Sequence, residues 1–577
     1  MTMEVGTFNR IIFILFCLIV TPFCHTQSLW EGNTSPNYSE LINYVKKLSK
    51  DHPEIELYSM GQSDYGEPIY TIIINGAGDS LKTFQKARNT TTLLINNAIH
   101  PGEPDGINAC LIWIDNWIKK GKIISELPVI AIIPAYNVGG MYNRSSTSRA
   151  NQNGPEEYGF RGNARNLDLN RDFIKADAEN TKTFYRIFHS LDPDVFVDNH
   201  VSNGADYPYT LTYISSLKER MFPGIRKLTY GQLIPYLTKV LRKNKWELFP
   251  YVELKGKTPE EGIIAFNDLP RYAMGYASLF NSISFTVETH MLKPFPERVK
   301  ATHDFMDELI CWMGGHSKSI EAERLKAKMW AKSTNIFHFK HELADVKDSI
   351  WFKGYESEYL KNETTQLKHL NYNRLKPYEK YIPYYNRYFS ADSILIPDFY
   401  VLGNQEKKAK EILFLNQVEY AELKKDTIMK LKVLVVKDFK SITKPYEGHF
   451  KHHEVLLAPP SLQDVKLKKG DWIIPTKQEK SLFINAVLWP ETEDSFTTWN
   501  FFDSYLQQKE YFSTYVFKDK IDEILNNNET LKRAFELKLK SEPGFASNEW
   551  DQLYYIYANS PYFEQTFMRL PVFIGNY

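Results

Sequence analysis

A histidine and a glutamate stand three residues apart in the stretch NNAIHPGEPDG. The apolar run before them, residues 91–99, predicts a buried strand, and residues 104–120 predict an amphipathic helix opened by a proline. Imidazole and carboxylate groups bind zinc, and active sites collect at the carboxyl ends of strands in open α/β sheets. His100 and Glu103 are therefore candidate metal ligands. The alternative is structural: His100 caps the turn, and Glu103 favours the positive end of the helix.

A third ligand and a general base are expected at the ends of two other strands. A catalytic zinc has three protein ligands and an open position for water. The apolar run DVFVDNH ends on His200, which would complete a site of two histidines and one carboxylate. The run SISFTVE ends on Glu288, a carboxylate that could take a proton from the water. The alternative for Glu288 is an ion pair with Arg298 or Lys293.

The stretch FRGNARNLDLNRDF carries the polar groups that such a site would need. Arg161 or Arg165 could stabilise an oxyanion beside the metal. Arg171 with Asn170 offers a planar fork and an amide, which suit a carboxylate group of a substrate. Asp168 could accept the second ring N–H of a ligand histidine and so orient it. Without that context, a loop with three arginines predicts a surface network of ion pairs.

The elements that must position these residues alternate between strand and helix from about residue 40 to 315. Runs such as TTLLINNAI, LPVIAIIPAYN and NSISFTVETH are almost continuously apolar, which is typical of strands covered on both faces. The sequence therefore predicts an α/β fold, a mostly parallel twisted sheet with helices on both faces. After about residue 320, short aromatic-rich strands and a helix-rich end predict a mixed α/β accessory region.

The composition and the N-terminus limit the class of protein. Lys+Arg and Asp+Glu both number 70 among the 577 residues, so no basic excess points to nucleic acid. Arg10 and the apolar run IIFILFCLIVTPF predict a signal peptide over residues 1–26, because a membrane anchor needs about 20 apolar residues. We therefore expect a secreted or periplasmic protein without an integral membrane segment after cleavage; the alternative is that the apolar run is retained as an anchor. Its catalytic domain is expected at 27–320 and its accessory region, possibly two subdomains, at 321–577.

Other potential ligands are given structural interpretations. Cys110 and Cys311 remain after signal cleavage and are either buried thiols or one disulfide bridge. The stretch EGHFKHHEVLL concentrates four potential ligands, but adjacent residues of a strand point to opposite faces. A solvated strand edge is therefore preferred over a metal site there for His449, His452, His453 and Glu454.

Taken together, the ordered blocks resemble the zinc metallocarboxypeptidase family of the carboxypeptidase A and D type. The blocks are HPGE at 100–103, DLNRDF at 168–173, His200 followed by YPYT, and SFTVE ending on Glu288. Their order and spacing match the family over roughly residues 40–315. The chain is also similar to secreted bacterial members with a long C-terminal extension.

The resemblance implies a role for each site residue. It implies one zinc ion per catalytic domain, with His100, Glu103 and His200 as ligands and Glu288 as general acid and base. The substrate would be bound by Arg161 at the oxyanion, by Asn170 and Arg171 at the terminal carboxylate, and by Tyr276, favoured over Tyr272, as a capping tyrosine. Asp168 would be the carboxylate that orients a ligand. Thr210 stands where basic-specific members similar to carboxypeptidase D carry Asp, which argues against a preference for Lys or Arg.

The expected function is that of a secreted zinc-dependent carboxypeptidase that hydrolyses the C-terminal bond of peptides or proteins through metal-activated water. One alternative is a zinc amidohydrolase that acts on cell-wall or side-chain-linked peptides. Another is a peptide- or glycan-binding protein with a vestigial catalytic domain. The complete set of polar site residues favours an enzyme.

Overall fold

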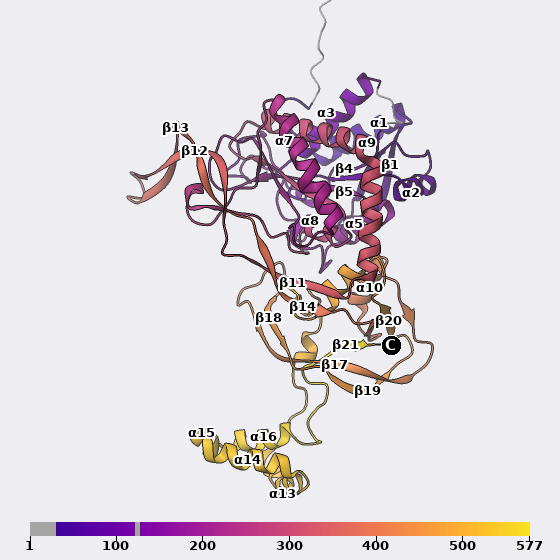
Figure 1. Cartoon of the computed structure of the whole chain (residues 1–577), viewed down its shortest axis with the longest axis vertical. Helices are drawn as coiled ribbons and strands as arrows, with labels where there is room; N and C mark the ends of the chain where they lie inside the picture. The colour runs from indigo at the N-terminus through magenta and orange to yellow at the C-terminus, as the bar shows by residue number, and fades with distance from the viewer. Residues whose placement is uncertain (1–29, 122–126, 577) are drawn as a thin grey trace, which may run out of the picture.

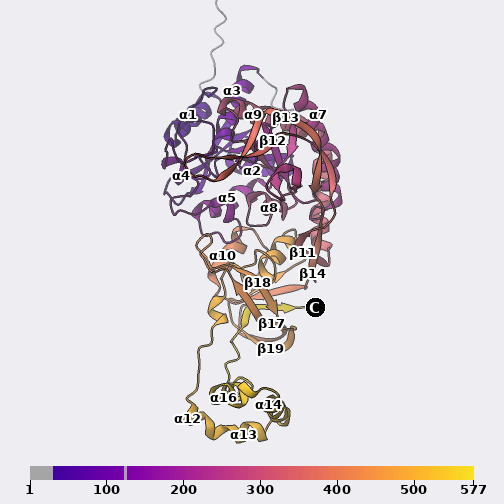
Figure 2. The ribbon, with the colours of Figure 1, turned by 90° about the vertical axis from the view of Figure 1, so that its left-hand side faces the viewer.

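The computed structural model describes residues 30–121 and 127–576. An N-terminal α/β unit, a β-rich C-terminal unit and a small helical unit follow one another along the long axis of the molecule (Figures 1 and 2). The expected signal peptide at 1–26 lies outside the described residues. Within them, no helix is both long and apolar enough to cross a membrane.

The N-terminal unit is built on an eight-stranded sheet. In spatial order its strands are β1 (Ile55–Gln62), β2 (Pro68–Ile74), β4 (Val129–Ile133), β3 (Thr92–Asn96), β5 (Val195–Ser202), β10 (Ile283–His290), β6 (Leu211–Ser215) and β7 (Leu248–Pro250). The central strands β4, β3, β5 and β10 run parallel, whereas β1 pairs with β2, β2 with β4 and β6 with β10 in antiparallel fashion. Strands β3 and β4 are buried at every position, as their apolar runs predict.

Helices cover both faces of this sheet. They are α1 (Tyr38–Asp51), α2 (Ser80–Asn89), α3 (Asp105–Lys119), α4 (Val138–Tyr142), α5 (Glu179–Leu191), α6 (Pro223–Leu228), α7 (Ile234–Lys243), α8 (Ala273–Ser278) and α9 (Phe295–Ser333). Side chains alternate along β5, so Phe196 and Asn199 point to opposite faces. Phe196 packs on Phe184 of α5, with ring centroids 5.9 Å apart. Asn199 instead lies against Gly106 of α3 and Met306 of α9. The predicted α/β fold is confirmed: the four central strands are mutually parallel, and at one edge β7 pairs in parallel with β6.

Helix α9 continues through residue 320 and leads the chain toward the C-terminal unit (Figure 1). Strands β11 (Ile336–Leu343) and β14 (Tyr388–Leu395) then pair. Between them in sequence lies a long hairpin of β12 (Asp348–Lys361) and β13 (Lys368–Tyr385), which returns to the N-terminal unit. There β13 pairs with β9 (Ile263–Ile264), and β9 pairs with β8 (Glu253–Leu254). Phe352 of this hairpin is fully buried against Tyr209 and Phe249. The hairpin thus adds a packed contact between distant parts of the chain.

The C-terminal unit is a second sheet, of seven strands. Its strands are β15 (Phe399–Leu402), β16 (Ala421–Glu422), β17 (Thr427–Ser441), β18 (His452–Leu457), β19 (Ser461–Leu467), β20 (Trp472–Pro475) and β21 (Arg569–Gly575), with helices α10 (Lys407–Leu415) and α11 (Ser481–Leu488). The last strand, β21, lies between β15 and β17 inside this sheet. The helical unit of α12 (Thr514–Phe517), α13 (Ile521–Asn526), α14 (Glu529–Ser541), α15 (Pro543–Ala546) and α16 (Glu549–Ala558) is therefore an insertion between two parts of one sheet.

Both cysteines of the described residues are free thiols, Cys110 buried on α3 and Cys311 exposed on α9. The two residues therefore do not form the disulfide bridge that the sequence left open.

Candidate metal centre and active site

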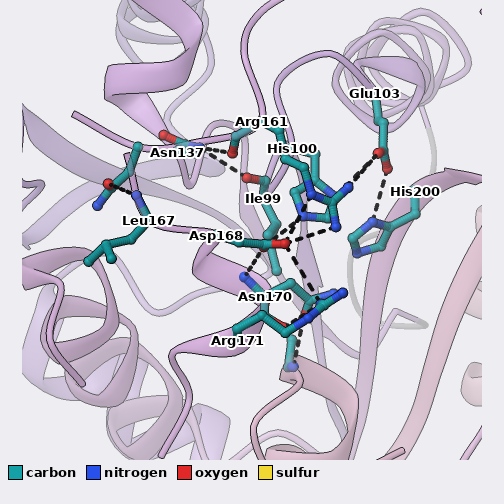
Figure 3. A network of polar contacts seen from close by, with 12 residues as sticks. Ile99, His100, Glu103, Asn137, Arg161, Leu167, Asp168, Asn170, Arg171 and His200 are labelled. Atoms are coloured by element: carbon teal, nitrogen blue, oxygen red, sulfur yellow. Dashed lines mark hydrogen bonds and ion pairs between the residues drawn. The ribbon is translucent and has the colours of Figure 1, made fainter. Parts of the chain in front are cut away.

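The three candidate ligands meet at the carboxyl ends of neighbouring strands. His100 and Glu103 lie in the turn between β3 and α3, and His200 is on β5, the parallel neighbour of β3. One ligand atom from each residue lies within 4.8 Å of the others, and all three side chains are buried. Figure 3 shows Glu103 facing both imidazole rings.

Each imidazole is oriented by a carboxylate behind it. Nδ1 of His100 lies 3.2 Å from Glu103, and Nδ1 of His200 lies 3.0 Å from the same carboxylate. The opposite ring nitrogens donate to Asp168, at 3.0 Å, and to Asp198, at 2.7 Å. This arrangement leaves the Nδ1 lone pair of each ring directed at the space beside Glu103.

The charge balance and the donor set of this site fit a zinc ion. Against the desolvation of burial, His100 and Arg161 hold the pKa of Asp168 well below its usual range. Burial also opposes ionisation of Glu103, yet Arg149 and His100 keep its pKa well below normal. Ionised carboxylates thus surround two imidazoles, a site that favours a cation. Two nitrogens and one carboxylate are a ligand set of catalytic zinc.

Glu288 lies beside this centre, and no residue of the described ranges forms an ion pair with it. It stands next to His200 in the register of β10 with β5, and its side chain lines the same pocket. Its Oε2 atom is buried and has no hydrogen-bond partner among the described residues. Burial raises the pKa of Glu288 to about 8; His200 opposes this rise, and the negative charge of Glu103 adds to it. The alternative pairing with Arg298 is absent, because Arg298 is bound to Asp105 at 2.7 Å.

The sequence offered two arginines, Arg161 and Arg165, as candidates to stabilise an oxyanion, and the structure places only one of the two in the pocket. Arg161 lines the pocket, lies 3.3 Å from Nδ1 of His100 and is held by Asp168 at 2.9 Å. Arg165 points away, toward the carbonyl of Asp177, and its side chain is 54% exposed. Of these two arginines, Arg161 is therefore the one that lies at the candidate metal centre.

Asn170 and Arg171 form the wall of the pocket that follows Asp168. Asp168 caps the short helix Leu169–Arg171 by accepting a hydrogen bond from the backbone N–H of Asn170 at 2.9 Å. The side-chain oxygen of Asn170 accepts from the backbone N–H of Ala273 at 3.0 Å, so its NH₂ group is left for the pocket. The guanidinium of Arg171 lies 4.6 Å from the ring centroid of Tyr272.

A model of a known protein family matches the part of the chain that carries most of these site residues. Residues 41–258 match the family model described as zinc carboxypeptidase. Residues 41–258 are therefore identified as a zinc carboxypeptidase domain. The matched range contains the candidate ligands, Arg161, Asn170 and Arg171, whereas Glu288 lies beyond it and is placed by the structure. No curated protein matches the chain.

Three of the solved structures similar to this chain are described as carboxypeptidases. One from Burkholderia cenocepacia is 14% identical, covers 47% of this chain and 67% of its own, and has a TM-score of 0.34. A putative carboxypeptidase A from Shewanella denitrificans is 17% identical over 49% and 69% of the two chains, with a TM-score of 0.35. Carboxypeptidase A from Helicoverpa armigera is 14% identical over 51% and 75%, with a TM-score of 0.37.

The expectation for the capping tyrosine of the carboxypeptidase is wrong at Tyr276. This residue is fully buried, and its hydroxyl donates to Asn416 at 2.6 Å and lies 3.0 Å from His189. It belongs to an aromatic core on the inner side of α8, because its helical position turns it toward α5. Tyr272, at the start of α8, is the residue that lines the pocket.

Sequence reasoning missed several residues of the carboxypeptidase site. Asp198 stands two residues before His200 on the same face of β5, a strand spacing that could have revealed it. Arg149 contacts Glu103 from a loop whose sequence gave no signal. The apolar and aromatic part of the pocket comes from separate segments, namely Ile214, Tyr251, Phe266 and Met274.

Thr210 and the histidine-rich stretch, two features that the sequence analysis singled out, both lie outside the lining of the carboxypeptidase pocket. Thr210 does not line it, and its hydroxyl donates to Glu297 at 2.5 Å. The histidine-rich stretch is dispersed: His449 binds Asp177, His452 binds Asp503, and Glu454 binds Lys440. The four side chains do not gather as a ligand group within the described residues.

Proposed function

We propose that this zinc carboxypeptidase acts outside the cytoplasm and releases residues one at a time from the free C-termini of peptides and proteins. The observation that carries the proposal is that Asn170 and Arg171 line the same pocket as His100, Glu103, His200 and Glu288. The Oε2 atom of Glu288 has no hydrogen-bond partner within the described part of the chain. A cationic fork beside a hydrolytic centre selects substrates that present a carboxylate.

Arg171 and the NH₂ group of Asn170 would hold the terminal carboxylate. The guanidinium is restrained from behind by the carbonyl of Asn170, at 2.8 Å, and from the side by the ring of Tyr272. Because a guanidinium donates through a rigid fork, it binds a carboxylate in two places and fixes its orientation. Because the last peptide carbonyl is a fixed number of bonds from the terminal carboxylate, binding of that carboxylate also positions the carbonyl in the pocket.

Glu288 would move the protons of the reaction. A zinc ion bound at this site supplies positive charge that acidifies a water molecule and polarises the scissile carbonyl. Glu288 accepts the proton of the attacking water on its free carboxylate oxygen and delivers it to the leaving amine. Arg161 donates to the developing oxyanion; loss of one such donor typically costs about 2.7–4 kcal/mol.

The apolar part of the pocket would receive the side chain of the departing residue. Ile214, Met274 and Phe266 line it, and none of the pocket-lining residues is an acid other than Glu103 and Glu288. A pocket of this composition favours an apolar or aromatic terminal side chain through burial of its surface. Secretion is supported by the apolar run IIFILFCLIVTPF after Arg10.

The experiment compares wild-type protein with Glu288→Gln and with Glu253→Gln, a half-buried control outside the pocket lining. Bound zinc per chain and release of amino acids from a peptide mixture are measured for each. We expect one zinc in all three and a loss of about 10²–10⁴-fold in turnover only for Glu288→Gln. Undiminished turnover in that variant would remove Glu288 from the mechanism, and no release by the zinc-loaded wild type would overturn the function.

A further inference from the structure

A loop of the C-terminal unit reaches the active site of the N-terminal unit. Residues 446–449 form a tight turn closed by a bridge between Tyr446 and His449. A side-chain oxygen of Glu447 accepts a hydrogen bond from the backbone N–H of Asp168 at 2.7 Å. His449 fixes the other side of the turn by contacting Asp177 at 2.7 Å. The turn therefore lies against the segment that carries Asp168.

Asp168 connects this turn to the groups of the site. Its carboxylate accepts from Nε2 of His100 at 3.0 Å and from Arg161 at 2.9 Å. It also caps the short helix that ends with Arg171. A shift of the Asp168 backbone would consequently move the carboxylate-binding side chains and the orientation of His100 together.

The C-terminal unit also holds the segment that carries Tyr272, another residue of the pocket lining. Asp494 accepts hydrogen bonds from the backbone N–H of Arg271 at 3.0 Å and pairs with its guanidinium at 3.0 Å. The guanidinium lies over the ring of Trp499, 5.6 Å from its centroid. The next residue, Tyr272, packs against Arg171, whose guanidinium lies 4.6 Å from the centroid of its ring. The segment that carries Asp168 and the segment that carries Tyr272 are thus both held by contacts with the C-terminal unit.

These contacts are packed rather than superficial. Asp494 and Trp499 are fully buried, and the ring of Trp499 stacks on Tyr446, with centroids 6.1 Å apart. Buried, hydrogen-bonded contacts fix geometry because each lost partner leaves a polar group unsatisfied. The position of Glu447 relative to Asp168 is therefore set by the fold of the C-terminal unit.

We propose that Glu447 is a positioning residue for the carboxylate-binding segment Asp168–Arg171, so that the C-terminal unit completes the active site. This inference rests on the proposed function, in which Arg171 binds the terminal carboxylate of the substrate. Glu447 itself is not among the residues that line the pocket. Its effect is exerted through the backbone of Asp168.

The test compares Glu447→Ala, Glu447→Gln and a matched control, Glu479→Ala, in the full-length zinc-loaded protein. Glu479 is also a glutamate of the C-terminal unit and pairs with Lys332 of α9 at 3.3 Å, away from the pocket. The values of kcat and KM for a free-acid peptide and the Tm are measured. We expect Glu447→Ala to raise KM about tenfold. Glu447→Gln should stay within about threefold of wild type, since its amide oxygen still accepts the hydrogen bond.

The control separates positioning from general stability. Glu479→Ala is expected to leave KM unchanged whatever it does to the Tm. An unchanged KM in Glu447→Ala would overturn the inference, as would equal damage in Glu447→Gln and Glu447→Ala or an equal rise in the control. Failure of the wild type to release any residue would instead overturn the proposed function and, with it, this inference.

Discussion

Asp168 and Asp198 determine how the two candidate zinc-binding histidines present their ring nitrogens. Each accepts the Nε2–H of one imidazole, so both Nδ1 atoms face Glu103. The sequence identified Asp168 through its motif, whereas Asp198 was read only as part of an apolar run. Local motifs thus predicted the polar groups that stand in one short stretch or at a strand end.

Pocket residues that only the tertiary structure brings together could not be predicted from the sequence. Tyr272 and Tyr276 are both tyrosines near the same helix start, and sequence offers no means of deciding which side of α8 faces the pocket. The structure places Tyr272 at the pocket and Tyr276 in the core. Ile214 and Met274 likewise come from separate elements.

At the residue scale, Ile214→Asp should change the preferred terminal residue. The new carboxylate would lie in an otherwise apolar part of the pocket, where it pairs with a basic side chain and is poorly solvated with an apolar one. We expect the ratio of kcat/KM for C-terminal Arg over C-terminal Phe to rise by at least about tenfold. Thr210→Asp is the matched control, and an equal change there would contradict the assignment of Ile214 to the side-chain pocket.

At the scale of elements, the strand and helix pattern predicted the N-terminal sheet because its central strands are buried on both faces. The C-terminal unit was less predictable, since its last strand, β21, returns to the sheet after a helical insertion and pairs with strands far away in sequence. The hairpin β12–β13 was also not predictable, because the partners of Phe352 lie far away in sequence.

Helix α5 is joined to the C-terminal unit through a buried neutral histidine. Burial, helped by the charge of Lys480, lowers the pKa of His189 to about 3. Its Nε2 lies 3.0 Å from Asn416 and 3.0 Å from the Tyr276 hydroxyl. The folded state therefore resists protonation of this imidazole, whereas the unfolded chain binds the proton near pH 6.5.

This contact makes stability depend on pH. Above about pH 6.5 the imidazole is neutral in both states, and below it the unfolded state binds more protons, so the free energy of unfolding falls as the pH drops toward 3. In His189→Gln, which does not titrate, we expect a smaller loss of stability between pH 7 and pH 5. Denaturant unfolding at both pH values measures this. An identical pH dependence in the variant would contradict a neutral buried His189.

At the scale of the whole molecule, the helical unit projects from the end of the C-terminal unit farthest from the catalytic sheet (Figures 1 and 2). Its buried residues, including Phe517, Leu553 and Ile556, form a core of their own. The chain leaves and returns at one place, where the backbone N–H of Lys509 donates to Glu564 at 2.8 Å.

Removal of this helical unit should leave catalysis unchanged. We expect a variant with residues 511–562 replaced by a short Gly-Ser linker to keep kcat/KM within about twofold of wild type, because it retains β21 and the contacts at the active site. Peptide hydrolysis by the zinc-loaded variant measures this. A loss of more than about tenfold, with the C-terminal sheet still folded, would place the helical unit in the catalytic machinery.

The most direct test of the proposed function is mass spectrometry of matched peptides with free-acid and amidated C-termini, with and without a chelator. Wild-type protein and Arg165→Met should remove single terminal residues from the free acids only, and chelation should abolish the reaction. Arg171→Met should lose the preference for free acids. Equal cleavage of acids and amides by the wild type would contradict the account, because Arg171 would then not recognise a terminal carboxylate.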